Sequence, residues 1–91
     1  MSTKEKVSEE LLLDEETVKQ NEIVLFNDEV NTFEHVIHTL IDACEHTPEQ
    51  AEQCSLIVHY KGKCTVKTGN FKKLKPMRDS ICDAGIDARI H

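Results

Sequence analysis

The sequence lacks the features that mark membrane, secreted or disulfide-bonded proteins. No apolar run approaches the ~18–20 residues that a membrane-spanning helix needs. The N-terminus lacks the apolar core of a signal peptide, and no two cysteines have C-x-x-C spacing. The four cysteines are Cys44, Cys54, Cys64 and Cys82. We therefore expect a soluble cytoplasmic protein whose reduced thiols pack mainly as small hydrophobic side chains.

Length and charge divide the 91 residues into a tail and one small domain. Residues 1–22 carry seven Asp or Glu against three Lys, whereas residues 23–91 carry ten acidic and eight basic side chains. The N-terminal segment has one apolar island, Leu11–Leu13, and cannot bury enough surface to offset its ordering entropy. We predict a disordered acidic extension over residues 1–21 and a folded domain over residues 22–91.

Small size and acidic charge also limit the classes of function. A domain of about 70 residues buries only about 60% of its unfolded surface, so a shallow pocket is easier to build than a deep catalytic cleft. Binding is therefore favoured over catalysis. The acidic tail argues against nucleic acid as a partner, since such binding requires an unopposed basic surface.

The clearest secondary-structure signal is an apolar strand followed by an amphipathic helix. Ile23–Phe26 is a continuous apolar run, which predicts a buried central strand. Polar residues 27–32 end it, and Thr32 can cap the next helix. The apolar positions of that helix are spaced by three and four residues: Phe33, Val36, Ile37, Leu40, Ile41 and Cys44.

A capping-box signature predicts the second helix. Thr47 and Gln50 stand three residues apart, with Pro48 at the first helical position. The helix is expected to stop near Tyr60, ahead of Gly62. A short strand over residues 63–67 is expected to follow, with Cys64 and Val66 facing inward.

The sequence pattern in the C-terminal third of the chain predicts a helix followed by a strand. Asn70 could open the helix, but Pro76 removes a backbone donor, so we expect regular helix only from about Lys75. Gly85 suits the position just after its end. Residues 86–90 alternate with period two and predict a strand with one buried face. The whole order, β-α-α-β-α-β, predicts an α+β sandwich: a three-stranded antiparallel sheet with three helices packed on one face.

Two polar segments stand out against this framework. Asn27-Asp28-Glu29 directly follows the first strand, and Val58-His59-Tyr60-Lys61-Gly62-Lys63 spans the predicted end of the second helix. Asn, Asp, Glu and neutral His all offer lone pairs to an N–H donor, so together they could hold a small ammonium group. Taken separately, the first segment could simply form an Asx-turn, and His59 could interact with the helix dipole.

With these two segments, the sequence from about Asn21 to His91 resembles the ClpS family, adaptors that hand N-degron substrates to a Clp chaperone-protease. The resemblance implies that Asn27, Glu29 and His59 receive the free α-amino group of a substrate, with Asp28 in the same turn. It also implies a hydrophobic pocket with these lining residues: Asn31, Phe33, Val36, Ser55, Val58 and Ile86.

Four of these positions depart from the commoner family pattern. Glu29 stands where the family often has Asp, and Asn31 where it often has Thr. Phe33 and Ser55 both replace a frequent Met. Phe is rigid where Met adapts, and Ser removes most of a side chain, so the shape of the pocket and its preferred ligand are expected to differ.

The resemblance implies an adaptor that binds N-degrons starting with Leu, Phe, Tyr or Trp and delivers them to a Clp AAA+ unfoldase of the ClpA or ClpC type. The alternative within the family is a regulatory domain that binds the chaperone without recognising N-degrons. We expect a monomer that needs no cofactor.

The sequence also allows an enzymatic alternative and a metal-binding alternative. His59 could act as a general base oriented by Glu29, but Ser55, one helix turn earlier, has no oxyanion-forming glycine turn beside it. His35 and His38 could chelate a metal from one helix, yet no third and fourth ligand has suitable spacing. We predict neither an enzyme nor a metal site.

Overall fold

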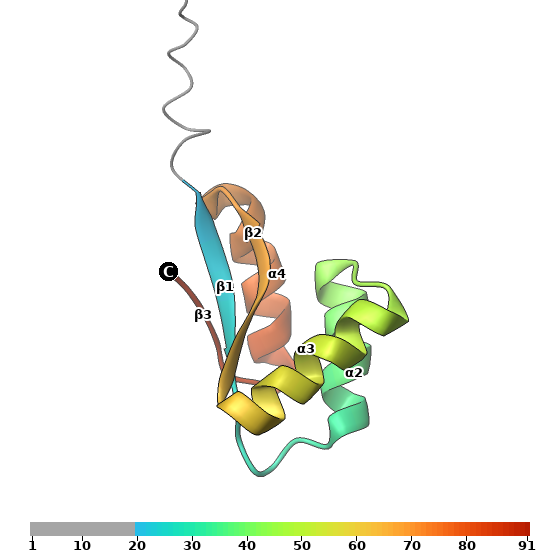
Figure 1. The fold of residues 1–91 in the computed structure, drawn as a ribbon. Coiled ribbons are helices and arrows are strands. Elements are labelled where there is room, and N and C mark those ends of the chain that lie inside the picture. Colours follow the sequence, from blue (N-terminus) through green and yellow to red (C-terminus); the bar gives the residue numbers. More distant parts are fainter. Residues whose placement is uncertain (1–19) are drawn as a thin grey trace, which may run out of the picture.

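The computed structural model describes residues 20–91, so the predicted leucine island lies outside the described residues, as does the predicted extension except for residues 20 and 21. Six elements follow one another in the predicted order (Figure 1). They are β1 (Asn21–Phe26), α2 (Phe33–Cys44), α3 (Pro48–Lys61), β2 (Lys63–Gly69), α4 (Phe71–Asp83) and β3 (Ala88–Ile90).

The sheet has the order β2-β1-β3, and both pairings are antiparallel. The central strand β1 buries Ile23, Val24 and Leu25, as its continuous apolar run predicts. Phe26 pairs with Lys63 at one end of the β1–β2 ladder. The three helices lie on one side of the sheet (Figure 1), which confirms the predicted α+β fold class.

The core lies between the sheet and the helices and draws on every element. The largest fully buried side chains come from β1, α2 and α4: Ile23, Leu25, Leu40, Cys44, Leu74 and Ile81. The inner face of α3 contributes small residues instead, because its buried positions are Ala51, Ser55 and Val58. This leaves α3 with less bulk facing α2 than a leucine-rich helix would provide.

The predicted helix caps are present. The Thr32 hydroxyl accepts a hydrogen bond from the backbone N–H of His35, and Thr47 forms a complete capping box with Gln50. Gly62 ends α3 in the left-handed region at φ 93°. Each cap satisfies backbone groups that the first or last turn of a helix leaves unpaired.

The predicted start of α4 near Lys75 is wrong. The helix begins at Phe71, because the side chain of Asn70 accepts a hydrogen bond from the backbone N–H of Lys73 at 2.8 Å. Pro76 therefore lies inside the helix and costs one backbone hydrogen bond. The cap, together with the complete burial of Leu74, outweighs that loss.

The last two strands differ in length from their predictions. β2 continues to Gly69 instead of ending at residue 67. β3 contains only Ala88–Ile90, because the N–H of Ile86 donates to the carbonyl of Ile81 and so belongs to the end of α4. The alternation itself is correct, since Ile86 and Ala88 are both buried and Asp87 is exposed. Cys82 is exposed, unlike the other three cysteines, so it does not pack as the small hydrophobic side chain expected of these thiols.

Two kinds of feature are absent from the part of the chain that the structure describes. None of its helices combines the length and the hydropathy that crossing a bilayer requires. Within residues 20–91, no three His, Cys, Asp or Glu side chains are arranged to hold a metal ion. His35 instead donates from Nε2 to the carbonyl of Ala84 at 2.8 Å.

The packing predicts that Leu40→Ala lowers the free energy of unfolding by about 2–5 kcal/mol, because Leu40 is fully buried and its truncation leaves a cavity. Urea denaturation measures this. Leu56→Ala is the matched control, since the same substitution occurs where the side chain is 37% exposed. Equal losses in the two variants would contradict the placement of the core.

Candidate functional site

One backbone hydrogen bond brings the two polar segments of the sequence together. The N–H of Asn27, directly after β1, donates to the carbonyl of Gly62, directly after α3, at 2.9 Å. Because His59 lies in the last turn of α3, this bond places it beside the residues that follow β1. The loop over residues 27–32 and the C-terminal half of α3 therefore face each other.

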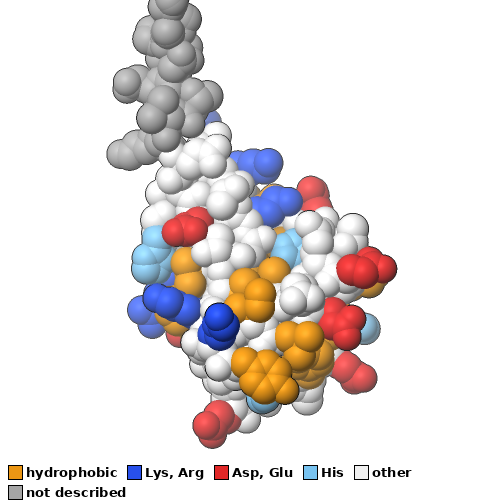
Figure 2. All heavy atoms as spheres, viewed as in Figure 1, with side chains coloured by type: hydrophobic (Ala, Val, Ile, Leu, Met, Phe, Trp, Pro, Cys, Tyr) orange, Lys and Arg blue, Asp and Glu red, His pale blue; other side chains and the backbone are white. Residues whose placement is uncertain are grey.

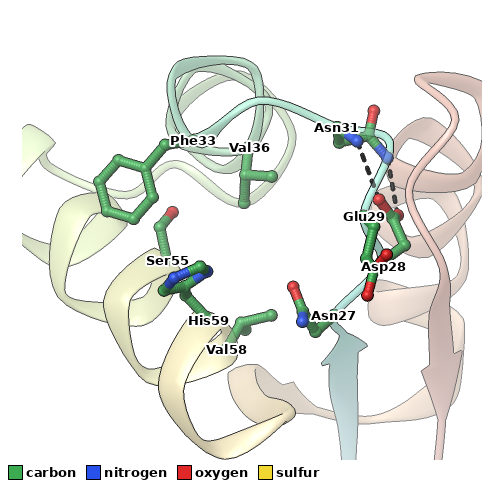
Figure 3. A pocket seen from close by; sticks show the side chains of 9 residues that line it. All are labelled: Asn27, Asp28, Glu29, Asn31, Phe33, Val36, Ser55, Val58 and His59. Carbon is green, nitrogen blue, oxygen red and sulfur yellow. Dashed lines mark hydrogen bonds between the residues drawn. The ribbon is translucent and has the colours of Figure 1, made fainter.

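A cavity of about 590 Å³ lies between this loop, the start of α2 and α3 (Figure 3). Figure 3 shows the loop side chains on one side of it and the α3 side chains on the other, with α2 above. Nine of the ten predicted site residues line it: Asn27, Asp28, Glu29, Asn31, Phe33, Val36, Ser55, Val58 and His59.

Ile86, the tenth, does not line this cavity. It lines a much smaller space of about 30 Å³, which shares Asn27, Asp28, Asn31, Val36 and Val58 with the larger cavity. Ile86 also precedes β3 instead of lying on it. The structure therefore places Ile86 behind the shared wall, where it supports residues that face the cavity.

Asp28 holds the loop in shape. Its Oδ1 accepts hydrogen bonds from the backbone N–H groups of Val30 and Asn31, both at 2.9 Å, which is the Asx-turn considered from the sequence. Its Oδ2 accepts a third bond from Asn31 Nδ2 at 2.7 Å. These bonds lower the pKa of the Asp28 carboxyl, with the backbone N–H of Asn31 as the largest cause.

Asn31 links the loop to the end of α4. Its Nδ2 donates to the carbonyl of Gly85 at 2.9 Å as well as to Asp28. Gly85 has a left-handed φ of 89°, which a residue with a side chain rarely adopts. Both donors of the Asn31 amide are thus used within the protein, so its side chain has no N–H group left to donate to a ligand.

Asn27, Glu29 and His59 are exposed polar residues at the cavity. Figure 3 shows His59 across the cavity from the loop that carries Glu29. The ring of Tyr60 packs edge-on against that of His59, with 5.0 Å between the ring centroids. An amide oxygen, a carboxylate and an imidazole nitrogen thus lie around one opening, and each can accept a hydrogen bond.

The walls of the cavity are mainly apolar. Val36 and Val58 come from α2 and α3, and Val58 is only 5% exposed. Phe33 lies at the first position of α2 and is 39% exposed. Ser55 interrupts this surface with a hydroxyl group, although its side chain is 3% exposed.

Further apolar groups lie on the surface near the cavity. Figure 2 shows hydrophobic side chains gathered over the face that α3 forms, with acidic side chains along the edge where α2 and α3 meet. Two of the exposed large hydrophobic residues, Leu56 and Tyr60, belong to α3, and Tyr60 is 77% exposed. An apolar surface beside a polar opening suits a protein or peptide ligand better than a small polar metabolite.

The sequence prediction missed the carbonyl groups that hold the site. Gly62 and Gly85 contribute through their backbone oxygens, which accept from Asn27 and Asn31. Glycine after a helix signalled the left-handed turns, but no sequence pattern indicates which N–H group a carbonyl will receive.

Comparison with known proteins identifies close similarities. The family model described as "ATP-dependent Clp protease adaptor protein ClpS" matches residues 16–87. The ATP-dependent Clp protease adapter protein ClpS of Nitratidesulfovibrio vulgaris (Miyazaki F) is 34% identical over 70 residues, which cover 72% of this chain and 70% of that protein.

A solved structure shares the fold. It is Agrobacterium tumefaciens ClpS2 bound to L-phenylalaninamide, which matches with a TM-score of 0.67 over 80% of this chain and 95% of the other. The two sequences are 13% identical over this match. The likeness therefore concerns the arrangement of the helices and strands.

The Asx-turn predicts a specific pH dependence. Because the folded pKa of Asp28 is below its ordinary value of 3.8, the turn adds stability that is present above that value and is lost as pH falls through the folded pKa. We expect NMR titration to show the Asp28 carboxyl protonating below pH 3.8, with the amides of Val30 and Asn31 shifting at the same midpoint. In Asp28→Asn these amide shifts should disappear. Protonation of Asp28 at or above its ordinary value would contradict the turn.

Proposed function

This chain belongs to the ClpS family of adaptor proteins for the ATP-dependent Clp protease, and from that premise we propose that it binds N-degrons. In this proposal the cavity captures the free N-terminal residue of a substrate when that residue has a bulky hydrophobic side chain. The adaptor then delivers the substrate to a Clp AAA+ unfoldase of the ClpA or ClpC type. The adaptor role needs no chemical step and no cofactor.

The observation that carries the proposal is the convergence of both polar segments on one partly apolar cavity. An N-terminal ammonium group has three N–H donors and a positive charge. Asn27, Glu29 and His59 offer three acceptors at the opening, one of them a carboxylate. An internal peptide nitrogen has no charge and only one N–H donor, so this opening favours chain ends.

The walls suit the side chain of the same residue. A side chain that enters between Val36, Val58 and Phe33 leaves water for apolar contacts, and burial of a large apolar side chain is worth about 1.5–3 kcal/mol. A volume of about 590 Å³ lies in the range of ordinary ligand pockets. These walls support Leu, Phe, Tyr and Trp as preferred first residues.

The ligand of the structural relative supports the same assignment. Agrobacterium ClpS2 was solved with L-phenylalaninamide, which combines a free amino group with an aromatic side chain. Delivery to an unfoldase rests on family membership, since the family consists of Clp protease adaptors. The departures at Glu29, Phe33 and Ser55 leave the acceptors and apolar walls in place.

We expect N-terminal acetylation of a Phe-initiated peptide to weaken binding at least roughly a hundredfold. Acetylation removes the charge and two donors, and it leaves the acceptors of Asn27, Glu29 and His59 unpaired against the ligand. Fluorescence anisotropy with otherwise identical peptides measures this. Equal affinity for free and acetylated peptides would reject N-degron binding and favour a regulatory domain that acts on the chaperone alone.

His59→Ala should weaken binding of the free peptide by roughly tenfold to a hundredfold, because it removes one acceptor of a charged donor. Its melting temperature should stay close to that of the wild type, since His59 is exposed. His38→Ala is the matched control, an exposed helical histidine outside the cavity. If both variants bind like the wild type, His59 does not contact the ligand.

A further inference from the structure

Ser55 presents a buried hydroxyl to the cavity without a partner. Its Oγ is one of two buried side-chain polar atoms that find no hydrogen bond within residues 20–91, and the other, His46 Nδ1, does not line the cavity. The Ser55 side chain is 3% exposed. Figure 3 shows its hydroxyl directed toward the side of the cavity where Phe33 and Val36 lie.

An unpaired hydroxyl in this position is unusual. Buried polar groups are nearly always hydrogen-bonded, and a helical Ser or Thr can donate to the carbonyl four residues earlier. Thr39 does so in α2, where its Oγ1 donates to the carbonyl of His35 at 2.8 Å. The Ser55 hydroxyl makes no such bond to Ala51, so a ligand hydroxyl that reached it would displace no existing hydrogen bond.

The position of Ser55 along α3 indicates which part of a bound ligand would reach its hydroxyl. An α-helix rises 1.5 Å per residue, so Ser55 lies about 6 Å, one helical turn, from His59. If the ligand's ammonium group lies near His59, its side chain runs past Val58 toward Ser55. The length of a tyrosine side chain spans this interval and puts its hydroxyl at the Ser55 end.

We propose that Ser55 recognises a phenolic hydroxyl, so that this adaptor prefers N-degrons that begin with tyrosine over those that begin with phenylalanine. The inference rests on the proposed function, because it assumes that the first residue of a substrate occupies the cavity. A tyrosine hydroxyl both donates and accepts, so it can pair with Ser55 whichever way the serine hydrogen points. The indole of tryptophan only donates, and leucine offers no polar group.

Phenylalanine also fits the apolar walls, but it leaves the Ser55 hydroxyl buried and unpaired. A site that can bind a hydroxyl discriminates against the analogue that lacks it, because only the hydroxyl-bearing ligand gives the polar group of the site a partner. The preference thus comes from the hydrogen bond that tyrosine gains, since phenylalanine leaves the Ser55 hydroxyl as unpaired as it is in the free protein.

The test is a cycle of two ligands and two proteins. Peptides that differ only in a Tyr or Phe first residue are titrated calorimetrically against the full chain and its Ser55→Ala variant. We expect the wild type to bind the Tyr peptide about threefold to tenfold more tightly than the Phe peptide. Ser55→Ala should abolish that ratio. Ser80→Ala, an exposed serine on α4 outside the cavity, should retain it.

We expect the Ser55→Ala variant to fold like the wild type. Alanine has a higher helix propensity than serine, and Ser55 has no hydrogen bond within the described residues to lose, so the melting temperature should not fall. Equal wild-type affinity for the two peptides, or tighter binding of Phe, would overturn the proposal. So would a Tyr preference that survives in Ser55→Ala. Failure of both free peptides to bind above their acetylated forms would instead reject the proposed function itself.

Discussion

The arrangement of the site depends on the backbone turn at Gly62. Gly62 is the single residue between α3 and β2, and its carbonyl accepts the hydrogen bond from the N–H of Asn27. A Cβ atom at position 62 would meet no other atom within 4 Å, so the left-handed φ of 93°, and not a lack of space, favours glycine here. Because β2 pairs with β1 in a fixed register, the end of α3 must lie beside the end of β1. His59 and Asn27 are brought together by the sheet, not by a contact between their own side chains.

A second set of bonds gives the loop over residues 27–32 a defined shape. Asp28 accepts three hydrogen bonds within the loop, and Asn31 extends the network to the carbonyl of Gly85 at the end of α4. The polar groups of Asp28 and Asn31 therefore position the loop, while Asn27 and Glu29 remain exposed at the cavity. This division explains how neighbouring residues of one short segment serve different purposes. A preorganised loop also reduces the entropy that ligand binding would otherwise cost.

Local sequence signals predicted much of the fold, because caps and apolar periodicity act within a few residues. Thr32, the capping box at Thr47 and the buried run at Ile23–Phe26 all gave correct elements. The error at α4 arose because a proline penalty was weighed without the burial of Leu74, which only the packed structure reveals. Nine of the ten predicted site residues lie around one cavity, but their selection came from a family resemblance and not from local pattern. The prediction that Ile86 lies on the last strand was wrong because its N–H bonds to Ile81, which periodicity alone does not determine.

The cavity exists because α3 contributes small side chains where a core helix usually contributes large ones. Its buried residues are Ala51, Ser55 and Val58, whereas α2 and α4 bury Leu40, Leu74 and Ile81. The largest fully buried side chains do not line the cavity, whereas Val58 belongs both to the buried core and to the cavity wall. A serine among the small residues adds a polar group to a wall that would otherwise select only by size. In the proposed function, this stripe of α3 therefore contributes both to the size of the pocket and to its choice of ligand, together with Phe33 and Val36 of α2.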